Sequence, residues 1–216
     1  MAEIVQYSVE KILPALDLSE RQGVFSLPEI KAIFKKIRAF EVTLLRSNRT
    51  QFDYLKYVNY LQSLIELVKR REIDSSKSNT LYKISKFTRD LLSRAVVKFP
   101  QDAKLWLTFI NFCKDNYFRD TVSQIYTQML QIHSTKPDIW ILAAKWHFEE
   151  ANSHNVARKL LQRGIRYNPE SKLLWVQYFK MELMYCDLIR KRRQVLMRQF
   201  EGDSTQSTKG ICRLRL

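Results

Sequence analysis

The chain has 216 residues, and its 37 Lys and Arg outnumber its 22 Asp and Glu, which gives a formal net charge of +15. Hydrophobic residues make up 45% of the sequence, a share that excludes a disordered polyelectrolyte despite the charge. Only 4 Gly and 5 Pro are present, which excludes a Gly-rich phosphate loop and disfavours a fold of many short strands joined by turns.

Amphipathic periodicity runs through most of the chain and predicts a succession of helices. A capping box at Ser26 and Glu29 opens a typical one, in which Ile33 and Ile37 fall on one face. In chain order, the predicted helices span residues 3–16, 29–46, 51–71, 79–98, 103–115, 120–132, 138–151, 154–167, 171–184 and 186–199. The short joints between them are typical of antiparallel neighbours.

A repeated unit covers the second half of the chain. Trp106, Trp140 and Trp175 are spaced by 34 and 35 residues, and an offset of 69 also places Pro100 on Pro169. The same offset places Ala95 on Gly164, where a small residue would let two helices approach closely. Units of this length are helix pairs that bury their apolar faces by stacking. The sequence therefore predicts an all-α fold, an α-solenoid of antiparallel helix pairs; the alternative is a generic helical bundle with coincidental Trp spacing.

The repeats divide the chain into three predicted regions. Residues 1–86 form an N-terminal helical region with a degenerate repeat, and residues 87–200 hold about three repeats. Residues 201–216 lose the periodicity and are expected to be a polar, disordered tail. If the chain is a truncated form of a longer array, its last helix pair should expose an apolar face that a following repeat would cover.

The third unit carries a recognisable pattern. Trp175, followed by Tyr178 and then Glu182, resembles the half-a-tetratricopeptide (HAT) repeat, whereas the units of Trp106 and Trp140 keep only the Trp. HAT arrays belong to large RNA-processing assemblies. This resemblance implies a structural role in the repeats for Trp106, Trp140, Trp175, Tyr178, Glu182, Pro100 and Pro169.

Several stretches resemble a more specific family, the U-three small nucleolar RNA-associated protein 6 family. They are MAEIVQ at the N-terminus, Phe25–Ile33, Ile132–Pro137, Ala143–Trp146 and Tyr178–Met184. The resemblance covers residues 1 to about 200 and implies a nucleolar HAT-repeat component of the small-subunit processome, in its UTP-B subcomplex. Its partners would be other processome proteins, with snoRNA or pre-ribosomal RNA as a further contact. Members of that family continue with many more repeats, so we expect a C-terminally truncated form.

The sequence predicts no catalytic residue, no cofactor and no metal site. We therefore expect that the protein is not an enzyme. His147 and His154 are seven residues apart, but no further ligand is placed to complete a metal site with them. The cysteines Cys113, Cys186 and Cys212 contain no Cys-x-x-Cys pair, which is typical of a reducing compartment. We expect a soluble protein of the nucleus and nucleolus, with no membrane and no small-molecule substrate among its partners.

The positive charge gathers in three stretches, because residues 31–49, 69–104 and 186–216 carry +5, +6 and +5. Two runs stand out as possible contacts with RNA or acidic partners: Lys69, Arg70 and Arg71, and then Arg190, Lys191, Arg192 and Arg193. Each run could equally be a solvated helix face, and the second could be a nuclear-localisation signal.

These observations favour a non-enzymatic scaffold of the small-subunit processome that supports pre-18S ribosomal RNA processing. Two alternatives stay open. One is a HAT-repeat scaffold of a splicing or RNA 3′-end-processing complex. The other is a direct RNA-binding protein, whose basic runs would form one continuous stripe.

Overall fold

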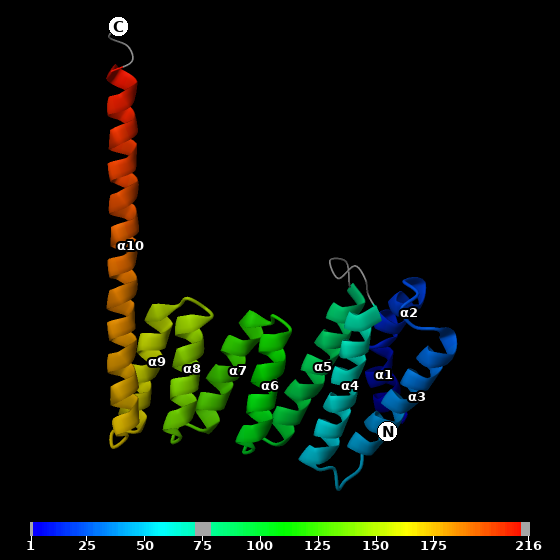
Figure 1. Cartoon of the computed structure of the whole chain (residues 1–216). Helices are drawn as coiled ribbons and strands as arrows, with labels where there is room; N and C mark the ends of the chain where they lie inside the picture. Colours follow the sequence, from blue (N-terminus) through cyan, green and yellow to red (C-terminus); the bar gives the residue numbers. More distant parts are fainter. Residues whose placement is uncertain (1, 72–78, 213–216) are drawn as a thin grey trace. The chain divides into compact units, whose positions relative to one another are not determined.

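The computed structural model describes residues 2–71 and 79–212 of the chain. Within these residues there are ten helices and no β-strand (Figure 1). The helices are α1 (Ala2–Glu10), α2 (Leu13–Arg21), α3 (Leu27–Leu44), α4 (Gln51–Arg71), α5 (Asn79–Lys98), α6 (Ala103–Asp115), α7 (Arg119–Ile132), α8 (Pro137–Glu149), α9 (His154–Tyr167) and α10 (Lys172–Cys212). Neighbouring helices such as α4 and α5, or α8 and α9, pack side by side in pairs, so the predicted fold class, an all-α solenoid of helix pairs, is confirmed.

The chain forms two compact units, Met1–Ile125 and Tyr126–Leu216. The boundary between the units follows Ile125, whereas the boundary predicted from the repeats follows residue 86. A compact unit and a sequence repeat are different things, so the predicted regions 1–86, 87–200 and 201–216 stay a prediction.

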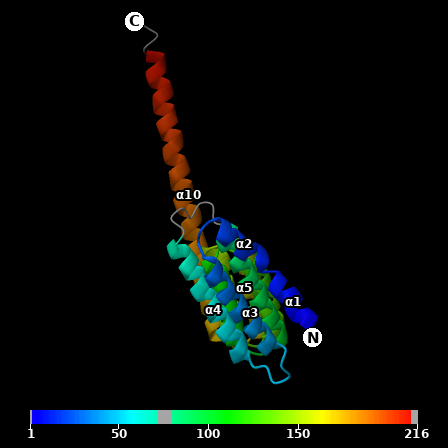
Figure 2. The same cartoon turned by 90° about the vertical axis from the view of Figure 1, so that its right-hand side faces the viewer.

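In the first unit, α3, α4 and α5 lie side by side (Figures 1 and 2). Tyr57 of α4 is fully buried at the centre of this group. Its ring stacks on Phe40 of α3, with centroids 4.9 Å apart, and meets Phe87 of α5 edge-on at 6.3 Å. Such aromatic pairs contribute beyond their buried area. Tyr57 is therefore a core residue of the first unit.

The predicted helix over residues 3–16 is wrong, because the chain turns between Glu10 and Leu13 and forms two short helices, α1 and α2. Pro14 explains the break. It has no N–H group, and its ring would clash with a helical carbonyl four residues earlier, so it is tolerated only in a first turn. It stands in the first turn of α2.

In the second unit, α9 packs against both α8 and α10. Gly164 of α9 makes the close approach possible. A Cβ atom at this position would lie 2.9 Å from Cγ of Trp140, too near for an ordinary contact. One turn later, Tyr167 stacks on the indole of Trp140 with centroids 5.6 Å apart. Gly164, the small residue predicted to let two helices approach closely, thus lies against one of the three repeat Trp residues, Trp140.

The predicted break between residues 184 and 186 is wrong, because α10 continues as one helix through Cys212. After α6 and α8 the chain reverses at Tyr117 and Asn152, whose φ angles of 61° and 52° are left-handed. The corresponding stretch around Cys186 holds no Gly, Pro or Asn, so nothing local stops the helix. The helix also includes residues 201–212, part of the expected disordered tail, while residues 213–216 lie outside the described residues.

Candidate interaction surfaces

Two of the three repeat Trp residues hold the loop that precedes their own helix. Trp106 is 2% exposed, and its Nε1–H donates to the carbonyl of Pro100 at 2.8 Å. Trp140 is 4% exposed, and its Nε1–H donates to the carbonyl of Ser134 at 2.9 Å. Each acceptor lies six residues before the Trp. The two units thus repeat one local design, in which a buried indole satisfies a loop carbonyl.

Trp175, at the corresponding position of α10, is instead 54% exposed. In α8 the equivalent positions to Trp175, Phe179 and Leu183 are Trp140, Ala144 and Phe148, and all three are buried. The exposed apolar residues of this part of α10 are Leu173, Trp175, Val176, Phe179, Leu183 and Met184. The apolar face expected on the last helix pair is therefore present, on α10.

The other two residues of the HAT pattern join α10 to α9. Glu182 accepts hydrogen bonds from Nε and Nη2 of Arg158, both at 2.6 Å, and these bonds lower the pKa of the Glu182 carboxyl. The Tyr178 hydroxyl accepts a hydrogen bond from Nε2 of Gln162 at 3.1 Å. Pro169 is exposed in the loop before α10. In this unit the pattern thus specifies contacts between helices.

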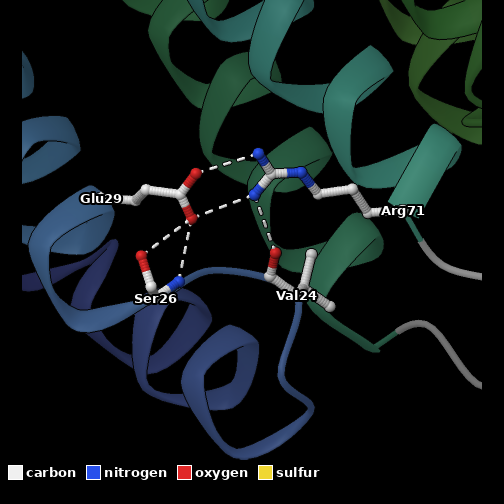
Figure 3. A network of polar contacts seen from close by, with 4 residues as sticks. All are labelled: Val24, Ser26, Glu29 and Arg71. Atoms are coloured by element: carbon white, nitrogen blue, oxygen red, sulfur yellow. Dashed lines mark hydrogen bonds and ion pairs between the residues drawn. The ribbon is translucent and has the colours of Figure 1, made fainter.

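In the first basic run, Arg71 is bound to another helix, whereas Lys69 and Arg70 are exposed. Figure 3 shows that Arg71, the last residue of α4, binds Glu29 in the first turn of α3. Its guanidinium binds both carboxylate oxygens of Glu29, at 2.9 and 3.0 Å, and donates to the carbonyl of Val24 at 3.0 Å. Glu29 at the same time accepts a hydrogen bond from the backbone N–H of Ser26 at 2.9 Å, as part of the predicted capping box, which is present at the start of α3.

Arg71 therefore stabilises the fold, whereas its neighbours face solvent. Lys69 is exposed, and the Arg70 side chain is 77% exposed beside Glu66, 3.9 Å away. The second run lies on α10, where Arg190, Lys191, Arg192 and Arg193 are all exposed. Arg190 approaches Asp187 at 3.9 Å, with three quarters of its side chain exposed. Such pairs contribute little, so these six side chains are available to a partner.

The Glu29 network gives a pH-dependent prediction. The hydrogen bond from Arg71, followed by that from Ser26, lowers the Glu29 pKa from 4.5 to about 2. A lowered folded-state pKa stabilises the fold above the unfolded value, and this contribution is lost as the pH falls from about 4.5 towards 2. We expect Glu29→Gln to lower the Tm at pH 7, and the difference from the parent chain to vanish near pH 2.

Thermal unfolding followed by circular dichroism at both pH values measures this effect. Glu66→Gln is the matched control, because Glu66 forms an exposed ion pair with Arg70 at 3.9 Å, and the change should alter the Tm little at either pH. An equal loss of Tm for Glu29→Gln at pH 7 and pH 2 would contradict the assignment.

Three further groups that could take part in chemistry, Cys113, His147 and His154, pack among other side chains. Burial raises the pKa of the Cys113 thiol to about 12 and lowers the pKa of His147. His154 lies between the rings of Phe148 and Tyr185, at 4.8 and 4.9 Å. Among residues 2–71 and 79–212, no three His, Cys, Asp or Glu side chains are grouped to hold a metal ion. Over the same residues, no helix has the length and apolar character needed to cross a membrane.

Sequence reasoning missed one buried polar cluster in the first unit. Glu41 of α3 is 4% exposed and accepts two hydrogen bonds from the guanidinium of Arg94, at 2.8 and 3.2 Å. Burial, followed by the charge of Glu41, raises the pKa of Tyr57. The signal was present, since Glu41 continues the apolar face formed by Ile33 and Ile37. A charged residue on a buried face needs a partner of opposite charge.

Fold and surfaces together define a helical-repeat protein with exposed basic runs. Residues 9–91 match the family model described as U3 small nucleolar RNA-associated protein 6. The chain is 39% identical over 198 residues to the U3 small nucleolar RNA-associated protein 6 homolog of Mus musculus, and 37% identical over 202 residues to that of Homo sapiens. Each of these alignments covers 90% of this chain and 33% of the relative.

The protein of the same name from Schizosaccharomyces pombe is 30% identical over 215 residues, or 98% of this chain and 44% of the relative. The predicted resemblance to the U3 small nucleolar RNA-associated protein 6 family is therefore confirmed. It spans about a third of the length of the mouse and human relatives that it matches.

Proposed function

We propose that this chain is a non-enzymatic scaffold segment in a nucleolar assembly that processes pre-18S ribosomal RNA with the U3 snoRNA. The single observation that carries the proposal is the similarity, over 90% of the chain, to relatives named for their association with U3 snoRNA. The role would fall in the small-subunit processome and its UTP-B subcomplex, with other processome proteins as the main partners.

The structure supports a scaffold role in physical terms. Helix pairs of a solenoid present large surfaces whose positions are fixed by their neighbours. This chain exposes an apolar stretch on α10 around Trp175 and Phe179, as well as the basic residues Arg190–Arg193 on the same helix. Apolar surface of this kind is typical of protein–protein contacts, and clustered Arg and Lys are typical of contacts with RNA phosphates.

Affinity purification of the tagged chain from cells tests the proposal. We expect U3 snoRNA and pre-ribosomal RNA to be enriched together with processome proteins. Spliceosomal small nuclear RNAs, probed in the same eluate, serve as the control for a general RNA-processing association. Enrichment of spliceosomal or 3′-end-processing components without U3 snoRNA would favour the alternative HAT-repeat assemblies and overturn the proposal.

Direct RNA binding is a second candidate, favoured by the exposure of all four residues Arg190–Arg193. Replacing the four with Gln should weaken binding of the purified chain to single-stranded RNA. Because each neutralised phosphate contributes about 0.7 to the slope of log K against log salt concentration, the slope should fall by up to about 3.

Fluorescence anisotropy at several salt concentrations gives that slope. Arg71→Gln is the matched control, because its guanidinium is occupied by Glu29 and Val24 and should contribute little to the RNA slope. A slope unchanged by the fourfold replacement would exclude this run from RNA contact.

A further inference from the structure

A pocket of about 420 Å³ lies within Met1–Ile125, apart from the basic runs discussed above. Its lining comes from α1, the end of α3, the loop after it, the start of α4 and the end of α5. The charged residues of this lining are Glu41, Arg49, Arg94 and Lys98, three cations against one carboxylate.

The one carboxylate of the lining, that of Glu41, already forms an ion pair. Glu41 is bound by both terminal nitrogens of Arg94, at 2.8 and 3.2 Å. No ion pair of Arg49 or Lys98 is present in the described part of the chain. The pocket therefore keeps the positive charge of two side chains without a negative partner, and it is complementary to an anionic group.

Arg49 also offers a specific donor. Its Nη1 donates to the carbonyl of Leu44 at 3.2 Å, which fixes the guanidinium at the end of α3. Its Nε atom is buried and, among the described residues, has no hydrogen-bond partner. A buried donor without an acceptor is costly, so the Arg49 side chain would gain by turning this N–H out to a ligand oxygen in the pocket.

Apart from Ser93, the uncharged residues of the lining are largely apolar, and they restrict the kind of anion. Leu44 and Tyr54 are each 6% exposed and form the inner part of the lining, whereas Val97 is 79% exposed. An Asp or Glu carboxylate next to an apolar side chain could pair with the cations and also fill the space beside the apolar walls. A phosphate flanked by hydrated sugars satisfies only the cations. The lining thus favours a peptide over RNA.

We propose that this pocket binds an acidic segment of a partner protein, with an Asp or Glu carboxylate at Arg49 and Lys98 and a neighbouring apolar side chain against Leu44, Tyr54 and Val97. Such recognition combines charge-assisted hydrogen bonds with the filling of an apolar recess. It is a binding activity beyond the processing role proposed above and does not rest on it.

Binding to a defined peptide tests the proposal with the full chain. The probe is a fluorescein-labelled octapeptide that repeats Glu-Leu-Asp-Leu, and its matched control repeats Gln-Leu-Asn-Leu. We expect saturable anisotropy for the acidic probe and at least about tenfold weaker binding for the amide control, since one charge-assisted contact is typically of that size.

Variants at the exposed Val97 locate the binding without disturbing the fold. Val97→Asp should weaken binding about tenfold relative to the isosteric Val97→Asn, because it adds a negative charge beside the bound carboxylate. Leu67→Asp, near the other end of α4, makes the same change in net charge away from the pocket and should match the parent chain. Arg49→Gln, which removes the donor, should also weaken binding about tenfold.

Three results would overturn the proposal: equal affinities for Val97→Asp and Val97→Asn, equal affinities for the acidic and amide peptides, or a loss in Leu67→Asp as large as in Val97→Asp. Tighter binding of an octauridine, sensitive to Val97→Asp, would show a phosphate site and would overturn it as well. None of these measurements reads out RNA processing, so such a failure would leave the proposed function standing.

Discussion

Replacing Trp140 with Ala is expected to lower the free energy of unfolding of the second unit by about 3–5 kcal/mol. Trp140 is 4% exposed, contacts Gly164 and Tyr167 of α9, and satisfies the carbonyl of Ser134. The substitution removes the indole from a site that cannot collapse easily, because Gly164 has no side chain to fill the space. It also leaves a loop carbonyl without its donor.

The matched control is the same substitution at Trp175. This residue holds the equivalent repeat position but is 54% exposed on α10, so Trp175→Ala should change the free energy of unfolding by less than about 1 kcal/mol. Urea unfolding followed by circular dichroism, with constant m-values, measures both variants. Equal losses at the two positions would mean that Trp175 is covered in solution.

The three repeat Trp residues show how far the sequence predicts this fold. Helical periodicity and the spacing of Trp106, Trp140 and Trp175 are local or repeating signals, and they predicted the fold class correctly. The same spacing gave all three residues one role, yet the structure buries two and exposes the third. Burial depends on which helix comes next, and here α10 runs on where a repeat would turn back.

The basic runs show a second limit of prediction from sequence, which concerns contacts between distant residues. Lys69, Arg70 and Arg71 cannot be told apart by helical periodicity, but among the described residues only Arg71 meets a carboxylate from another helix. The partner, Glu29, lies 42 residues away, and periodicity gives no information about such pairs. The pocket at Arg49 was equally hidden, because α1, α3, α4 and α5 each supply part of its lining. Glu41 was the exception, since a charge on an apolar face already predicts a partner.

The second large effect on stability is expected from replacing Arg94, the ion-pair partner of Glu41. Arg94→Met is expected to lower the free energy of unfolding of the first unit by about 2–4 kcal/mol, because it leaves the Glu41 carboxylate buried and unpaired. The Glu41 side chain is 5% exposed, whereas that of Arg94 is 44% exposed, which allows some relief by water and puts the value at or below the usual range. Urea unfolding measures the loss.

Two further variants separate the ion pair from general effects of charge. Arg70→Met breaks an exposed pair at 3.9 Å and should cost no more than about 0.5 kcal/mol. Combining Arg94→Met with Glu41→Leu removes both charges and should recover most of the stability, since a buried pair replaced by apolar residues of similar size is often neutral. If the double variant is no more stable than Arg94→Met, the cost lies in lost packing of the Arg94 side chain and not in the stranded carboxylate.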